Sequence, residues 1–110
     1  MTKQVYALLG ISAKAGKLKS GELSTLEAIR SGKAKLVIIA EDASAGTAEK
    51  FRNKCGSYQV PMFRFGEKET LGRSVGKEER SSLAILDEGL AGSLIRELSR
   101  KAEVKNNGKE

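Results

Sequence analysis

The chain has 110 residues, 39% of them hydrophobic and 31% charged, which suits one globular domain and leaves little room for a second. No apolar run approaches the roughly 20 residues that a membrane span needs, and the N-terminal apolar patch is shorter than a usual signal-peptide core. We therefore expect a cytoplasmic protein. The single cysteine agrees with this expectation, because one thiol cannot form an internal disulfide.

The net charge of +6 is concentrated near the N-terminus. Residues 1–40 carry seven basic and two acidic side chains, whereas residues 41–110 carry thirteen basic and twelve acidic ones. A local basic field attracts polyanions such as nucleic acids. The plainer interpretation of the same charges is a solvated face that aids solubility.

The apolar pattern predicts helices that alternate with short strands. In chain order, the expected elements are a helix over 2–16, a strand over 18–20, a helix over 21–32, a strand over 35–40, a helix over 44–58, a strand over 60–65, a helix over 67–76, a strand over 82–86 and a helix that begins at Asp87. The strand over 35–40 is apolar throughout, so we expect it to be buried on both faces. This alternation predicts a three-layer α/β/α sandwich, with residues 1–101 as a single domain and 102–110 as a disordered tail.

Helical spacing predicts which side chains face the core. In the second helix, Leu23, Leu26 and Ile29 or Arg30 follow one another at spacings of three and four, which is typical of one helical face. The two tyrosines, Tyr6 and Tyr58, are expected to lie on apolar helical faces and to be structural.

The chain offers few means of catalysis. It contains no histidine, and it has no Walker loop, dinucleotide fingerprint or paired nucleophile and base. Cys55 follows Ala48 and Phe51 at helical spacing. We therefore expect a small buried thiol rather than a nucleophile, since no histidine is available to activate it.

Carboxylates follow two of the apolar strands. Glu41 and Asp42 come after one, and Asp87 and Glu88 come after the other. Ligands of an open α/β sheet tend to bind outside the carboxyl ends of its strands, and four acids there could hold Mg²⁺, which would favour a carboxylate–metal enzyme. The favoured interpretation is helix capping, because each aspartate directly precedes a predicted helix.

Gly21 stands between basic residues and the first turn of the second helix. Lys17 and Lys19 precede it, and Lys33 and Lys35 follow the helix. The first turn of a helix has unpaired N–H groups and partial positive charge, so it can receive a phosphate. Glycine would let another backbone approach closely at that point.

A plain turn is the competing interpretation of this glycine. Ser20 or Ser24 could then be the N-cap of the helix, and the spacing from Ser24 to Glu27 fits a capping box.

Several motifs of the chain resemble a known family. They are "GKLKSG", "AIRSGKAKLVIIAEDAS", "KCGSYQVPMFRFGEKETLGRSVGK" and "SSLAILDEG", in this order over about residues 4–98. The pattern is similar to the ribosomal L7Ae superfamily of kink-turn RNA-binding proteins, and more closely to its bacterial YlxQ-type branch. The resemblance implies an α/β/α sandwich with a four-stranded mixed sheet. It also implies RNA binding through residues 17–30 and through the loop at 76–82.

Carried over to this sequence, the resemblance implies a set of RNA-binding residues and no catalytic or metal-binding ones. They are Lys17, Lys19, Ser20, Gly21, Glu22, Ser24, Glu27, Arg30, Lys33, Arg73, Lys77, Arg80 and Ser81.

The sequence departs from the family pattern where bases are read. Leu23, Ser24 and Glu27 stand at positions where kink-turn binders usually have Asn, Glu and Lys. The loop has the charged sequence "GKEERSS" where other members have small apolar residues. The glycine and the preceding lysines match. Since phosphate contacts position a complex and base contacts specify it, we expect RNA binding with altered or looser specificity.

The favoured prediction is therefore a ribosome-associated RNA-binding protein without catalysis or cofactor. We expect a monomer that binds structured RNA of the ribosome, with no membrane and no small-molecule substrate as partner. A protein–protein adaptor on the same fold is the second hypothesis, and the carboxylate–metal enzyme is the third.

Overall fold

The computed structural model describes residues 2–107 and places side chains over residues 2–100. Its elements in chain order are α1 (Thr2–Lys14), β1 (Leu18–Ser20), α2 (Glu22–Arg30), β2 (Leu36–Ile39), α3 (Ala45–Tyr58), β3 (Met62–Arg64), α4 (Lys68–Ser74), β4 (Ser82–Ile85) and α5 (Glu88–Asn107). Each element expected from the sequence is present. The last helix extends into the stretch expected to be a tail, 102–110, of which residues 108–110 lie outside the described part.

The four strands form one mixed sheet in the order β1-β4-β2-β3. Strand β4 is antiparallel to both of its neighbours, with Ala84 opposite Lys19 on β1 and Val37 on β2. Strand β3 is parallel to β2 and lies at the edge of the sheet. Pro61 directly precedes β3, at the start of an edge strand where its missing N–H costs no ladder hydrogen bond.

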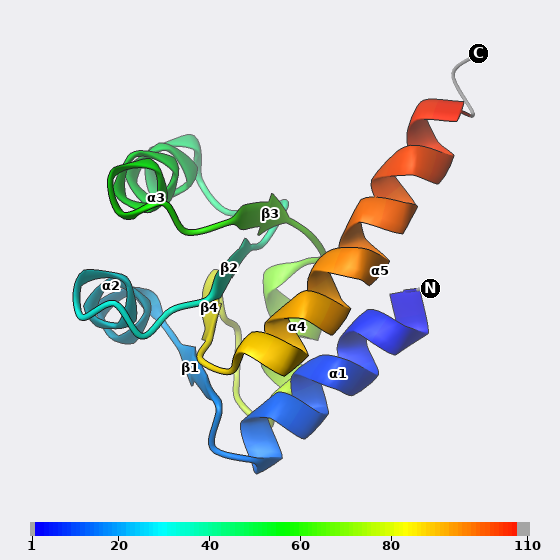
Figure 1. The fold of residues 1–110 in the computed structure, drawn as a ribbon, viewed down its shortest axis with the longest axis horizontal. Helices are drawn as coiled ribbons and strands as arrows, with labels where there is room; N and C mark the ends of the chain where they lie inside the picture. The colour runs from blue at the N-terminus through cyan, green and yellow to red at the C-terminus, as the bar shows by residue number, and fades with distance from the viewer. Residues whose placement is uncertain (1, 108–110) are drawn as a thin grey trace.

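Helices cover both faces of the sheet, as Figure 1 shows. Alternate side chains of β2 explain this arrangement, because successive residues of a strand point to opposite faces. Leu36 and Ile38 pack in the cluster that includes α1, α4 and α5, whereas Val37 and Ile39 pack in the cluster that includes α2 and α3. All four side chains are fully buried. The three-layer α/β/α prediction is confirmed.

Two predictions about helix faces are wrong. Leu23 is 80% exposed, because α2 begins at Glu22 and buries Thr25, Leu26, Ala28 and Ile29 instead. Tyr58 is 46% exposed, because it is the last residue of α3, a helix whose buried residues are Ala48, Phe51 and Cys55.

The interior thiol behaves as expected from the sequence. Cys55 lies in the cluster between α3 and the sheet, and burial raises the pKa of its thiol from 9.0 to about 11. The thiol is therefore protonated at neutral pH, the unreactive form.

The two aspartates that follow β2 and β4 cap helices. Asp87 accepts a hydrogen bond from the backbone N–H of Leu90 at the start of α5, at 2.9 Å. Asp42 accepts one from Lys68 N–H at 2.9 Å, so it serves α4 and not α3, the helix that it precedes. The parallel pairing of β2 with β3 explains this correction, because it brings the end of β2 beside the start of α4.

The sheet topology also separates the four acids. Because β2 and β4 are antiparallel, Glu41 and Asp42 lie at one edge and Asp87 and Glu88 at the opposite edge. The four-acid Mg²⁺ site is therefore wrong. In the part of the chain that the structure describes, no group of three or more His, Cys, Asp or Glu side chains is placed to hold a metal ion.

None of the helices among the described residues combines the length and the apolar character that crossing a bilayer requires.

Candidate nucleic-acid interface

The start of α2 has an unusual backbone. Gly21 occupies the N-cap position with φ 96° and ψ 158°, a conformation that is essentially restricted to glycine. Among the described residues, no side chain caps this end of the helix. The next three residues, 22–24, are exposed. This first turn therefore presents backbone N–H groups and the positive end of the helix dipole to the surface.

The serine alternatives for this helix start are wrong. Ser24 is already inside α2, so it cannot be the residue that caps it. Ser20 is the last residue of β1, and its hydroxyl accepts a hydrogen bond from Arg80 Nε at 3.0 Å.

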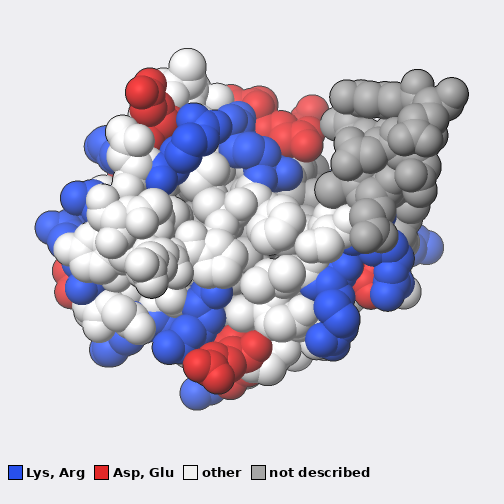
Figure 2. All heavy atoms as spheres, turned by 45° about the horizontal axis from the view of Figure 1, so that its top comes forward, with Lys and Arg blue, Asp and Glu red and all other residues white. Residues whose placement is uncertain are grey.

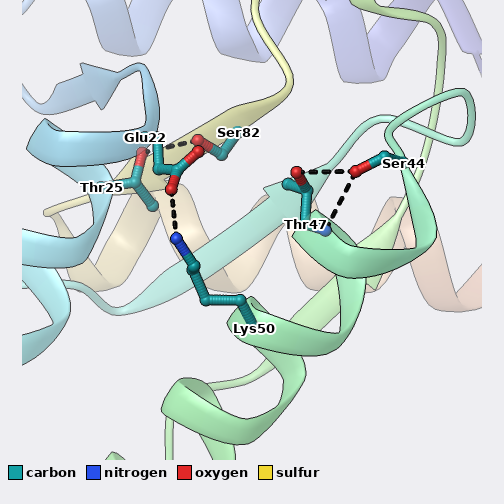
Figure 3. A network of polar contacts seen from close by, with 6 residues as sticks. All are labelled: Glu22, Thr25, Ser44, Thr47, Lys50 and Ser82. Atoms are coloured by element: carbon teal, nitrogen blue, oxygen red, sulfur yellow. Dashed lines mark hydrogen bonds and ion pairs between the residues drawn. The ribbon is translucent and has the colours of Figure 1, made fainter.

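The turn between α4 and β4 lies against the start of α2. Gly21 N–H donates to the carbonyl oxygen of Ser82 at 3.0 Å, next to the bond from Arg80 to Ser20. A buried hydrogen bond of 3.2 Å joins the hydroxyls of Ser82 and Thr25, which Figure 3 shows. These contacts join segments that lie about sixty residues apart in the chain.

The same turn is held against α4. A Cβ atom at Gly72 would lie 1.6 Å from the carbonyl oxygen of Glu78, so the turn approaches the helix too closely for any other residue. Lys77 N–H donates to the carbonyl of Gly72 at 2.8 Å, and Arg80 N–H donates to that of Lys68 at 3.0 Å. The position of Arg80 beside β1 therefore depends on Gly72.

An ion pair lies beside the start of α2. The Glu22 carboxylate, in the first turn, pairs with the Lys50 ammonium on α3 (Figure 3). An acidic side chain in the first turn interacts favourably with the helix dipole and so stabilises the helix, but it repels an approaching phosphate. Lys50 offsets part of that repulsion. It was absent from the predicted residues, and no local spacing could have indicated a partner 28 residues away.

A shallow groove of about 430 Å³ lies beside α2. It is lined by Lys19, Leu23, Ser24, Glu27, Ala28, Ser31, Lys33 and Leu86. The groove brings together a lysine before the helix and a lysine after it, as the sequence suggested. The exposed Leu23 forms part of its wall, together with Leu86.

The other predicted residues are less closely associated. Arg73 lies on the exposed face of α4, where it pairs with Glu69 at 3.1 Å. Three further basic residues are exposed, namely Lys17, Arg30 and Lys77. They do not line this groove, and they take no part in the hydrogen bonds around Gly21. The carbonyl oxygen of Ser81 accepts a hydrogen bond from Ala40 N–H at 2.9 Å.

Charge on the face seen in Figure 2 is distributed around a centre without charge. Lys and Arg side chains lie around the margin of this face, and Asp and Glu form only small groups among them. On this face the basic side chains therefore form separate groups and not one continuous patch, so local geometry has to identify the ones that bind a ligand.

The fold and these contacts agree with one protein family. The chain matches the Ribosomal protein L7Ae/L30e/S12e/Gadd45 family over residues 3–95, and it belongs to that family.

Individual relatives support the same assignment. The chain is 44% identical over 90 residues to the RNA-binding protein YlxQ of Bacillus subtilis, covering 82% of this chain and 90% of the relative. It is 33% identical over 90 residues to the large ribosomal subunit protein eL8 of Picrophilus torridus, covering 81% and 71%. The Giardia lamblia 15.5kD RNA binding protein has a similar structure, with a TM-score of 0.74, 28% identity and coverage of 90% and 84%. The resemblance to the YlxQ-type branch is confirmed.

Proposed function

We propose that the protein binds structured RNA through the start of α2, the turn at 76–81 and the groove beside α2. The observation that carries this proposal is the pair of contacts, Gly21 to Ser82 and Arg80 to Ser20, that hold the turn with Arg80 against an uncapped helix N-terminus. Two relatives whose names state RNA binding support it. The RNA partner would be ribosomal, and the protein would act as a cytoplasmic monomer without catalysis.

Phosphate contacts would provide most of the affinity. The space beside Gly21 is open, since a Cβ atom added there would meet no heavy atom within 4 Å, so a phosphate can reach the N–H groups of the first turn. Lys17 and Lys19 precede this turn and Arg80 lies next to it. These contacts would dock an RNA backbone regardless of its sequence.

Base recognition would be weaker than in a kink-turn reader with Asn, Glu and Lys in this helix. Leu23 has no hydrogen-bonding atoms in its side chain, and Glu27 has the sign that repels phosphate. Both side chains line the groove. We therefore infer kink-turn-like RNA binding with loose sequence specificity.

The test is the salt dependence of binding to a kink-turn RNA, measured by fluorescence anisotropy. Removal of one phosphate contact should flatten the slope of log K against log salt by about one. Lys17→Ala with Lys19→Ala should therefore flatten it by about two and weaken binding to a plain duplex equally. Lys3→Ala, an exposed charge on α1, is the control. An unchanged slope in the double variant would exclude this surface.

An adaptor that binds protein is the second candidate. The exposure of Leu23 beside Leu86 favours it, because apolar side chains anchor protein interfaces. Recovery of protein without RNA in a pull-down from nuclease-free lysate would support this candidate over the first.

A further inference from the structure

A second groove lies on α3, outside the proposed RNA surface at α2 and the turn. It has a volume of about 240 Å³ and is lined by Lys50, Asn53, Lys54 and Ser57. These residues follow one another at intervals of three, one and three, so they form one stripe along the helix. Each side chain can donate a hydrogen bond, and none of these lining residues is acidic.

The stripe is continuous with the start of α2. Its first residue, Lys50, is the one that pairs with Glu22, as Figure 3 shows. The two helices pack side by side on the same face of the sheet. A ligand that reaches the first turn of α2 is therefore at one end of the α3 groove.

We propose that this α3 stripe binds the sugar–phosphate backbone of the RNA and extends the site from α2 along α3. The inference rests on the proposed function, since it requires RNA at α2. Two ammonium groups attract phosphate, and the amide and hydroxyl between and beyond them donate to phosphate or sugar oxygens. Lys50 would exchange its bond with Glu22 for one with phosphate.

The chemistry of the groove favours RNA backbone over a protein partner or a stacked base. None of its lining residues is apolar or aromatic, whereas protein interfaces are anchored by buried aromatic and aliphatic side chains, and base stacking needs a planar side chain. The net charge of the sequence segments did not indicate this surface, because α3 belongs to residues 41–110, where basic and acidic residues nearly balance.

Lys54→Gln tests the inference, because it removes one charge and keeps most of the length of a half-buried side chain. Arg52→Gln is the matched control, since Arg52 is an exposed cation on the same helix that does not line the groove. The probes are a kink-turn RNA with long flanking stems and the same RNA with its stems truncated, in fluorescence anisotropy at fixed salt and across a salt series.

We expect Lys54→Gln to weaken binding of the long RNA by about three- to tenfold, to flatten its salt slope by about one, and to leave the truncated RNA nearly unaffected. Arg52→Gln should change neither RNA by more than about twofold. Equal effects of the two variants would overturn the inference, as would unchanged binding by Lys54→Gln. If Lys17→Ala with Lys19→Ala still weakens binding in that case, the proposed function stands and only the α3 extension fails. No RNA binding by the unmodified protein would overturn both.

Discussion

The two neighbouring helices α2 and α3 begin in opposite ways. At α3, Ser44 is the N-cap, and its hydroxyl accepts from Thr47 N–H at 3.1 Å and bonds the Thr47 hydroxyl at 3.0 Å (Figure 3). At α2, Gly21 takes the same position and offers no side chain. A side-chain cap satisfies one of the free N–H groups of the first turn, whereas a start without a cap leaves that group for a ligand as well.

The two helix starts also imply two different ways of binding a ligand, through the N-terminus of α2 and through side chains of α3. At the start of α3 the Ser44 hydroxyl already occupies the Thr47 N–H, and the α3 stripe proposed above would bind through side chains along the helix. The start of α2 is open and is held in place by long-range contacts to Ser82 and Arg80. Different effects on stability and on RNA affinity are therefore expected from substitutions at three places. These are the start of α2, the cap of α3 and the support of the turn that contains Arg80.

The largest effect is expected from Gly72→Ala, which removes the support of the turn. The added methyl group would overlap the carbonyl of Glu78, so we expect the free energy of unfolding to fall by about 3 kcal/mol. Displacement of Arg80 should also weaken RNA binding. Urea denaturation measures the first effect and anisotropy the second. Gly56→Ala on α3 is the control, because its space is open and alanine should stabilise the helix by up to about 1 kcal/mol.

The residues that kink-turn binders usually have at three positions of α2 can be introduced by substitution. Leu23→Asn, Ser24→Glu and Glu27→Lys together should raise affinity for a kink-turn RNA, because each good base contact gives about 1–3 kcal/mol of discrimination. A plain duplex should be little affected. Gel shifts of both proteins on both RNAs at one salt concentration measure the change. The idea fails if the unmodified protein already prefers the kink over the duplex by several hundredfold.

The two helix starts can be compared directly by paired substitutions. Gly21→Ala forces a methyl group into a backbone conformation reserved for glycine, so it should cost about 1–3 kcal/mol of stability and also weaken RNA binding. Ser44→Ala should cost about 1 kcal/mol by removing the cap, with RNA affinity unchanged. Urea denaturation and anisotropy measure both properties. An equal fall in RNA affinity for the two variants would show that the open start of α2 has no special role.

The last effect concerns the buried face of α3 and vanishes at neutral pH. Burial raises the pKa of Cys55 from 9.0 to about 11, so above about pH 9 the unfolded chain releases this proton while the folded protein retains it. The contribution of this thiol to stability should therefore fall as pH rises from about 9 toward 11. Urea denaturation across this range should show a steeper decline than in Cys55→Ala. Parallel curves would show that the folded thiol titrates normally.

Much of the fold could be predicted because it depends on local pattern. The apolar stretch of β2 predicted burial on both faces, and the alternation of elements predicted three layers. The helix faces were less predictable. Leu23 fits an apolar spacing in α2, but with about 3.6 residues per turn it lies on the side of the helix away from the buried Thr25 and Ile29.

The candidate site could be predicted only in part, because local pattern indicates residue types but not contacts between distant segments. Residue types and the resemblance indicated Gly21, Lys19 and Arg80 as members of one site. Their mutual contacts could not be inferred, since neither the bond from Arg80 to Ser20 nor the pair of Lys50 with Glu22 has a local signal.

The order of the elements, the buried strands, the basic N-terminal segment and the family all follow from the amino-acid sequence alone. The first three depend on the spacing of apolar and charged residues over short distances, and the family depends on the motifs that the chain shares with it.

Strand pairing, in contrast, sets which ends of the elements meet. The antiparallel pairing of β2 with β4 separates the two acidic pairs, and the parallel pairing of β2 with β3 turns Asp42 toward α4. The antiparallel pairing of β1 with β4 brings the turn that contains Arg80 to the open start of α2. No local sequence pattern predicts these contacts, because strand pairing places the ends of two strands side by side however far apart they lie in the sequence.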